Sequence, residues 1–188
     1  ILLSDDQDFN SMSLVNSNNG NPIMNNVKTL LGQEGTTFTN SFVSLPLCCP
    51  SRVTLLTGQY PHNHGILSNV PPDGGYQKFV TKENNTLATW LDASGYFTAY
   101  IGKYLNGYSG SIGKVFPQLP GGGPQINTKI PPGWDHWFAT YLHMFYNYFV
   151  NNNGTLTQVG EKETDYHTDY ICREAVRTIN QTPLNQPL

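Results

Sequence analysis

The period of the apolar positions changes several times along the chain, and each change predicts a new element of secondary structure. Short runs of β-branched and aromatic residues predict strands, whereas apolar residues three and four positions apart predict helices. We expect strands at 1–4, 36–43, 97–104, 134–141 and 144–160, the last with a hairpin turn at 152–154, and helices at 22–31, 50–57, 86–96 and 168–179. Residues 107–133 are rich in Gly and Pro, which predicts an irregular surface loop.

The order of these elements predicts the fold class. Helices alternate with strands through the first hundred residues, which indicates an α/β fold with helices on both faces of a sheet. Ligands bind to such sheets at the carboxyl ends of the strands. Asp5, Asp6 and Lys103 all lie at the ends of predicted strands, so we expect them at a site.

Composition narrows the class of function. Of the 188 residues 38% are hydrophobic, and the net charge is −3 with no long run of either sign, which argues against a nucleic-acid-binding surface. No apolar stretch reaches the roughly 20 residues that a membrane-spanning helix needs. Because the sequence begins within an apolar run and ends just after a predicted helix, we expect a piece of a longer chain, incomplete at both ends.

Three N-x-S/T sequons, at Asn84, Asn153 and Asn180, predict a glycosylated protein that is secreted or otherwise extracytoplasmic, for example lysosomal. The alternative is that an Asn-rich chain produces sequons by chance. The three cysteines leave at least one unpaired, which excludes a disulfide scaffold.

Cys48 stands at the start of a predicted helix in "CCPSR". If the helix begins at Pro50, Cys48 lies just before it, where free N–H groups and the helix dipole favour an anion. Arg52 lies four residues on and can reach back toward position 48. Such an arrangement suits attack on an anionic ester. The alternative is a pair of structural cysteines, one of them bonded to Cys172.

The segment 48–52, continued by "LLTG" at 55–58, resembles the C-x-P-S-R signature of the type I sulfatases. The resemblance implies an alkaline-phosphatase-like α/β fold with a mixed sheet, of which residues 1–188 would be the N-terminal part. It also implies that a formylglycine-generating enzyme oxidises Cys48 to formylglycine, whose hydrate attacks sulfur and then expels sulfate. Cys49 would then be a small packing residue.

Asp5 and Asp6 are the candidate metal ligands. Adjacent carboxylates repel each other unless a cation neutralises them, and hard oxygen ligands suit Ca²⁺, with Mg²⁺ as the second choice. The resemblance implies that the side chain formed from Cys48 also contacts this ion, and that an Asp-Asn pair further along a sulfatase chain completes the site. The alternative is a solvated turn.

The resemblance extends to "IGKYLNGY" at 101–108, which is similar to the Gly-Lys segment of the family, whose lysine contacts the sulfate. Lys103 is therefore a candidate catalytic and substrate-binding residue. Many sulfatases carry a histidine two residues later, where this chain has Leu105, and Asn106 could replace only its hydrogen bond. His62 and His64 are candidates for substrate binding, with packing as the alternative. We expect His136 and His143 to be structural or to lie at the rim of the site.

These features together predict a sulfuric ester hydrolase, similar to the branch that contains N-acetylglucosamine-6-sulfatases and arylsulfatases. The substrate would be an aryl or glycan sulfate, with N-acetylglucosamine 6-sulfate as one candidate. Two alternatives remain open: a phosphonate or phosphate monoester hydrolase on the same scaffold, and a homologue that binds sulfated glycans without cleaving them. The chemical state of residue 48 distinguishes the second alternative from an enzyme.

Overall fold

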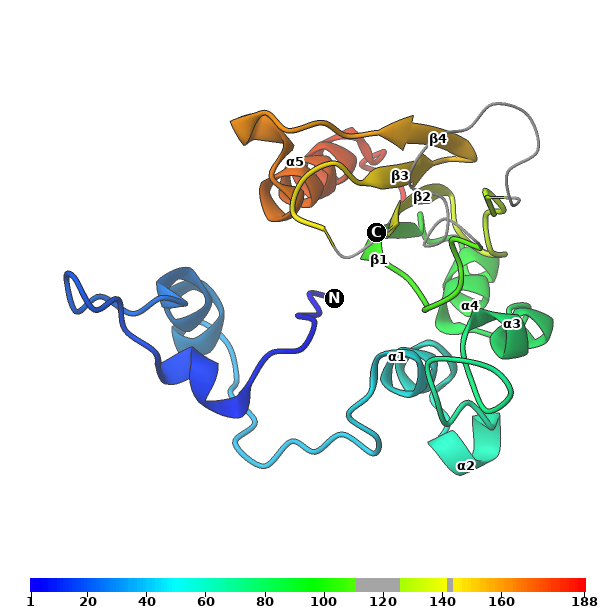
Figure 1. Cartoon of the computed structure of the whole chain (residues 1–188), viewed down its shortest axis with the longest axis horizontal. Helices are drawn as coiled ribbons and strands as arrows, with labels where there is room; N and C mark the ends of the chain where they lie inside the picture. The colour runs from blue at the N-terminus through cyan, green and yellow to red at the C-terminus, as the bar shows by residue number, and fades with distance from the viewer. Residues whose placement is uncertain (111–125, 142–143) are drawn as a thin grey trace. The chain divides into compact units, whose positions relative to one another are not determined.

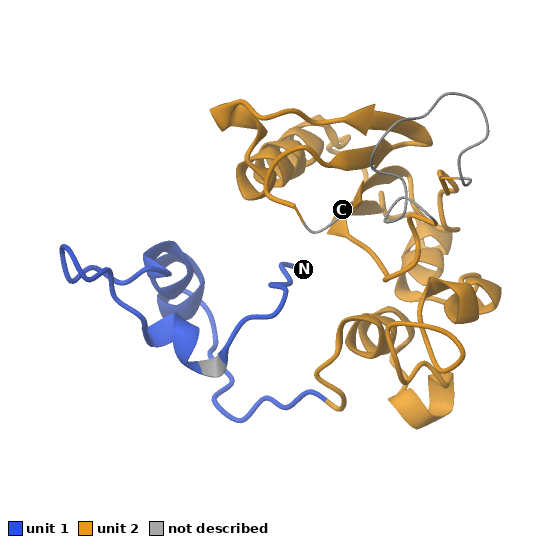
Figure 2. Ribbon diagram, viewed as in Figure 1, with its two compact units in different colours: residues 1–43 blue, residues 44–188 orange. Residues whose placement is uncertain are grey.

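The computed structural model describes residues 1–110, 126–141 and 144–188. The chain divides into two compact units, Ile1–Val43 and Ser44–Leu188, which Figure 2 shows in different colours. Within the described residues, the helices are all too short or too polar to cross a membrane. His143 and most of the predicted loop at 107–133 lie outside the described residues.

The first unit contains two short helices and no strand among its residues. The 3₁₀-helix η1 spans Phe9–Ser13, and the Asp8 side chain accepts a hydrogen bond of 2.7 Å from the backbone N–H of Asn10 at its start. The helix predicted over 22–31 begins further along the sequence than expected, as the π-helix η2 at Val27–Gln33.

The strands predicted at 1–4 and 36–43 are wrong. Ile1 is 92% exposed and Phe42 is 89% exposed, and both segments are irregular. A β-branched or aromatic composition favours a pleated, half-buried surface, but it cannot form a strand without a neighbour to pair with.

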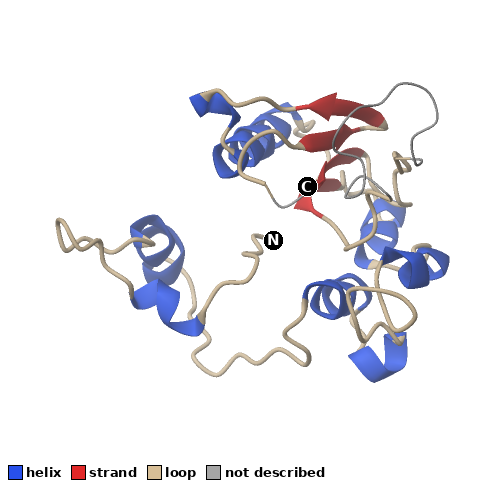
Figure 3. Cartoon of the chain, in the orientation of Figure 1, coloured by secondary structure: helices blue, strands red, loops and turns tan. Residues whose placement is uncertain are grey.

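The second unit is built on one mixed four-stranded sheet (Figures 1 and 3). Its strands are β1 (Ala99–Lys103), β2 (His136–Tyr141), β3 (Phe149–Asn152) and β4 (Thr155–Gln158), in the order β1-β2-β3-β4. β1 and β2 are parallel, and the other two pairs are antiparallel. Asn153 and Gly154 form the hairpin turn with φ of 48° and 87°, the left-handed conformation that such turns require. These predicted strands and the hairpin are confirmed.

Helices precede, connect and follow the strands of this sheet. They are α1 (Cys48–Thr57), α2 (Pro61–His64), α3 (Tyr76–Phe79), η3 (Val80–Lys82), α4 (Leu87–Ala93), η5 (Glu163–Asp165) and α5 (His167–Gln181). Gly58 ends α1 with φ of 65°, and a capping box between Thr86 and Thr89 starts α4. The helices predicted at 50–57, 86–96 and 168–179 are confirmed, with shifted ends.

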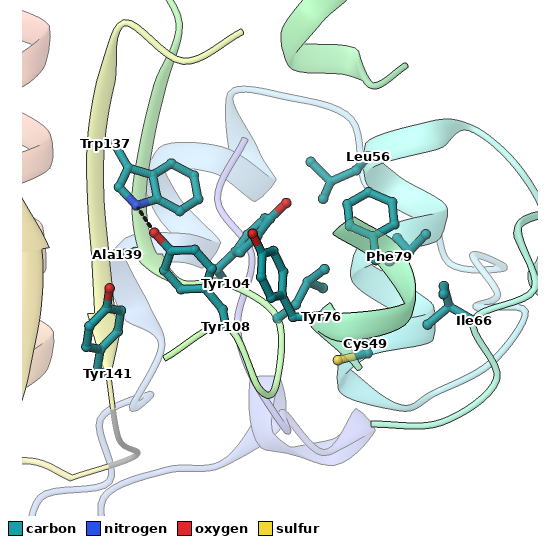
Figure 4. Packing of buried hydrophobic residues seen from close by; sticks show 12 residues of the cluster. Cys49, Leu56, Ile66, Tyr76, Phe79, Tyr104, Tyr108, Trp137, Ala139 and Tyr141 are labelled. Atoms are coloured by element: carbon teal, nitrogen blue, oxygen red, sulfur yellow. Dashed lines mark hydrogen bonds between the residues drawn. The ribbon is translucent and has the colours of Figure 1, made fainter. Parts of the chain in front are cut away.

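Strand β2 is buried at every position, because both of its faces are covered. Its side chains alternate: Trp137 and Tyr141 join a cluster that includes Leu56 of α1 (Figure 4). Phe138 points to the other face and stacks on Tyr170 of α5, with ring centroids 6.0 Å apart. The prediction of an α/β sheet with helices on both faces is therefore confirmed.

Candidate active site around Cys48

Helix α1 carries the cysteine pair in its first turn. The helix begins at Cys48 rather than at Pro50, and the backbone N–H of Ser51 donates to the carbonyl oxygen of Leu47 at 2.9 Å. Pro50 is thus the third helical residue, still within the turn where a missing N–H costs no hydrogen bond. Cys48 itself is half-buried, so its side chain is partly accessible at the N-terminus of α1.

The lysine that ends β1 lies beside this cysteine. The ammonium Nζ of Lys103 donates a hydrogen bond of 3.4 Å to the sulfur Sγ of Cys48. The two residues are 55 positions apart in the sequence, and the fold brings them together because β1 ends next to the first turn of α1. A fixed positive charge therefore stands within one hydrogen bond of position 48.

Arg52 lies one helical turn after Cys48 and is only 7% exposed. Its Nη1 donates to the carbonyl oxygen of Lys103 at 2.6 Å, and the hydroxyl of Tyr100 donates to the same oxygen at 2.5 Å. Tyr100 was not predicted as a site residue, since its aromatic ring in a strand carries no signal beyond burial. Arg52 thus ties α1 to the end of β1 and fixes the backbone that carries Lys103.

Cys49 is fully buried, and its side chain belongs to the hydrophobic core. Its backbone N–H donates to Oδ1 of Asn69 at 2.8 Å, so a side chain twenty residues away satisfies one of the free N–H groups of the helix. Burial raises the pKa of its thiol to about 11, so Cys49 keeps its proton at neutral pH. Cys48, Cys49 and Cys172 are all free, which contradicts the alternative of a disulfide with Cys172.

Leu105, which stands where many sulfatases have a histidine, is buried with 4% exposure. Asn106, next in the chain, donates its backbone N–H to Sγ of Cys49 at 3.1 Å, and its Oδ1 accepts from the same thiol at 3.4 Å. The side-chain oxygen and the backbone N–H of Asn106 are therefore both bonded to the thiol of Cys49. At this place in the fold the chain therefore has apolar packing at Leu105, followed by a cysteine–asparagine contact.

His64 lies in the core rather than at an open surface. Its Nδ1 accepts the backbone N–H of Ile66 at 3.0 Å, which leaves the proton of the neutral ring on Nε2, 3.1 Å from Oγ1 of Thr54. Burial is the main cause that lowers the pKa of His64 below its ordinary value. His64 therefore matches the alternative prediction, that it is a packing residue rather than a substrate-binding one. His62, by contrast, is exposed and stacks on Tyr60 with ring centroids 5.9 Å apart.

Asp5 and Asp6 belong to the first unit, where both are exposed. Asp6 has φ of 52°, a left-handed conformation that bends the chain directly after the apolar N-terminal residues. The pair offers four carboxylate oxygens from adjacent residues, a donor set that suits a hard divalent cation.

The remaining predicted residues lie outside this arrangement. His136 is buried, and its Nε2 lies 2.8 Å from Oε1 of Glu174 in α5, as expected of a structural histidine. The three sequon asparagines are exposed, Asn84, Asn153 and Asn180.

Three comparisons with known proteins bear on the site. The sequence profile of the family described as Sulfatase matches residues 1–187. The chain is 36% identical over 96% of its length to a putative extracellular sulfatase Sulf-1 homolog of Caenorhabditis elegans, and 35% identical over 92% of its length to the N-acetylglucosamine-6-sulfatase of Homo sapiens. It covers 22% and 29% of those two proteins.

A solved structure is also similar: a protein in complex with its substrate D-glucosamine-2-N,6-O-disulfate. It is 25% identical, with a TM-score of 0.56, over 80% of this chain and 25% of that one.

Proposed function

Because the chain belongs to the sulfatase family, we propose that it forms part of an enzyme that hydrolyses sulfate esters at residue 48. The observation that carries this proposal is the 3.4 Å hydrogen bond between Nζ of Lys103 and Sγ of Cys48, at the start of a helix with the C-x-P-S-R sequence. Buried hydrophobic clusters on both faces of β1 and β2 hold Lys103 and Cys48 in place.

The substrate we propose is the 6-O-sulfate of a glucosamine unit in a glycan. Two kinds of similarity support this choice: relatives named N-acetylglucosamine-6-sulfatase, and a similar structure solved with a 6-O-sulfated glucosamine. Arylsulfatases are also among the relatives, so small aryl sulfates should serve as test substrates.

Cys48 is the proposed precursor of formylglycine, made by a formylglycine-generating enzyme. One hydroxyl of the hydrated aldehyde would attack sulfur and displace the alcohol of the ester. The second hydroxyl would then lose its proton, and re-formation of the aldehyde would expel sulfate, after which water would restore the hydrate. Position 48 suits this chemistry, since its side chain is partly accessible while its backbone is fixed in the first turn of α1. The positive end of the helix dipole also favours the anionic ester there.

Lys103 is the proposed electrostatic catalyst and sulfate ligand. Its ammonium group donates a hydrogen bond to Sγ of Cys48, beside which the transferred sulfate would bind, and a fixed cation stabilises developing negative charge with little reorganisation. Arg52 holds the carbonyl oxygen of Lys103 and thereby the position of that cation. Both residues were predicted as catalytic, and in this proposal Arg52 acts in part through Lys103.

Asp5 and Asp6 are the proposed ligands of a divalent cation, Ca²⁺ in preference to Mg²⁺. The two exposed carboxylates fit such an ion, because each offers hard oxygens and their mutual repulsion favours a cation between them. When bound, the ion would polarise the sulfate ester and lower the pKa of a hydroxyl beside it. The further ligands would come from another part of a sulfatase chain.

The histidines play different proposed roles. His64 supports α1 from within the core, since both of its ring nitrogens are engaged. His62 is exposed and, with its partner Tyr60, would contact a longer glycan rather than the sulfate. The three exposed sequons and the extracellular relatives support a glycosylated, secreted or otherwise extracytoplasmic protein.

The experiment is to express the full-length protein with a formylglycine-generating enzyme and to compare turnover of an aryl sulfate, an aryl phosphate and glucosamine 6-sulfate. We expect sulfate esters to be preferred, and Lys103→Ala to lower kcat by about 10²–10³. Lys78→Ala, at an exposed lysine of α3, is the matched control. Preference for the phosphate would support the phosphatase alternative, and glycan binding without turnover would support the non-catalytic one. Either result would refute the proposed activity.

A further inference from the structure

Hydrogen bonds in both directions join Cys49 and Asn106, although the two residues are 57 positions apart in the sequence. The backbone N–H of Asn106 donates to Sγ of Cys49, and the thiol donates back to Oδ1 of Asn106, at 3.1 Å and 3.4 Å. Cys49 has no exposed surface, so water does not compete for its sulfur. Hydrogen bonds in such surroundings fix geometry more strongly than those at the surface.

This pair stands beside both residues of the proposed catalytic contact. Cys49 follows Cys48 in the first turn of α1, and Asn106 lies three residues after Lys103 in the segment that leaves β1. The pair therefore joins the two segments whose separation sets the 3.4 Å distance between Lys103 and Cys48.

Each member of the pair is itself held by a further residue. Asn69 accepts the backbone N–H of Cys49 at 2.8 Å, and the carbonyl oxygen of Asn106 accepts the backbone N–H of Tyr76 at 2.8 Å. Tyr76 begins α3 and packs in the same buried cluster as Cys49, as Figure 4 shows. The contact is thus anchored on both sides and cannot shift without disturbing the core.

We propose that Cys49 and Asn106 are positioning residues, which hold the segment after β1 against α1 so that Lys103 reaches residue 48. This inference rests on the proposed function only where activity is the readout. It differs from the expectation that Cys49 merely fills space. A space-filling residue needs only a small side chain, whereas this contact needs a side chain that both donates and accepts a hydrogen bond.

Substitutions at Cys49 separate these two roles. Cys49→Ser keeps a donor and an acceptor, and Cys49→Ala keeps a small side chain but removes both hydrogen bonds. Because Cys49 occupies the variable position of the C-x-P-S-R sequence, conversion of Cys48 should be equal in these variants, which peptide mass spectrometry can verify. We expect Cys49→Ala to lower kcat on an aryl sulfate by about tenfold or more with a smaller change in KM, since small displacements of catalytic groups are costly. Cys49→Ser should recover most of that loss.

Asn106→Ala tests the same contact from its other side. It should lower kcat about as much as Cys49→Ala, and the double variant should lose no more than the worse single variant, because both changes remove one shared contact. Cys172→Ala and Asn63→Ala, at exposed positions, are the matched controls and should leave kcat unchanged.

Crystal structures of the unconverted full-length protein provide a readout that does not depend on activity. In Cys49→Ala and Asn106→Ala, we expect Nζ of Lys103 to move out of hydrogen-bonding distance from Sγ of Cys48. A retained distance together with an unchanged kcat would overturn the proposal, as would equal kcat values for the Ala and Ser variants. If the wild-type protein hydrolyses no sulfate ester, the proposed function fails, but the distances still test the positioning role.

Discussion

The guanidinium group of Arg52 donates a 2.6 Å hydrogen bond to the backbone carbonyl oxygen of Lys103. This bond crosses from the second turn of α1 to the last residue of β1, so a buried arginine connects the helix of the proposed nucleophile to the strand of the proposed cation. The hydroxyl of Tyr100 donates to the same oxygen. The backbone at the end of β1 is therefore held by two side chains.

Replacement of Arg52 should reduce catalysis strongly. We expect Arg52→Ala to lower kcat on an aryl sulfate by on the order of 10²–10³, because it removes a fixed cation near residue 48 and frees the backbone of Lys103. Arg52→Lys should rescue little, since an ammonium group cannot reproduce the geometry of a guanidinium fork. Arg173→Ala, at an exposed arginine of α5, is the control. A folded Arg52→Ala variant with wild-type kcat would contradict this assignment.

The protonation of His64 should affect stability rather than catalysis. Burial lowers the pKa of His64 below its ordinary value of 6.5, so between the folded and unfolded pKa values only the unfolded chain binds the proton. This contribution to the free energy of unfolding is complete above about pH 6.5 and is lost as the pH falls below that value. Urea unfolding at several pH values should show a weaker acid dependence for His64→Gln than for the wild type. His62→Gln, at an exposed histidine, should retain the wild-type dependence; a His62→Gln result equal to His64→Gln would disprove the assignment.

Tyr108 is hydrogen-bonded to residues of the two central strands of the sheet, β2 and β3. Its buried hydroxyl accepts from Nε1 of Trp137 at 2.9 Å and from Nδ2 of Asn151 at 2.8 Å, and it donates to the carbonyl oxygen of Lys129. Tyr108→Phe would leave these groups unsatisfied, and we expect it to lower the free energy of unfolding by about 2–4 kcal/mol.

The control for Tyr108→Phe is Tyr60→Phe, since Tyr60 is 62% exposed and should tolerate the change. Chemical denaturation compares the two variants, and kcat measured well below the unfolding midpoint should be unchanged in both. Equal stability of the two would show that the buried hydrogen bonds contribute nothing net.

The helices and turns that were predicted correctly are those specified by a few neighbouring residues in the sequence. The hairpin at Asn153-Gly154 and the helix that Gly58 ends both depend on residues suited to left-handed conformations, and such signals act over a few positions. The segments 1–4 and 36–43 have the composition of strands, but a strand also needs a neighbour, which composition does not specify.

The same limit applies to the candidate site. The C-x-P-S-R sequence predicts Cys48 and Arg52 as site residues, and the Gly-Lys segment predicts Lys103. Asn69 and Tyr100 could not be found in this way, because their contacts with α1 and with the end of β1 depend on the tertiary fold. The burial of His64 likewise follows from the packing of α2 against α1, which no spacing in "YPHNHG" reveals.

The chemical state of residue 48 is the sharpest test of the proposed sulfatase chemistry. The measurement is peptide mass spectrometry across residues 48–52 of the active full-length protein, with Cys48→Ala as the companion variant. We expect an aldehyde at position 48 in the active protein, and a Cys48→Ala variant that folds normally but is inactive. A fully active protein that carries only a free thiol at Cys48 would contradict it.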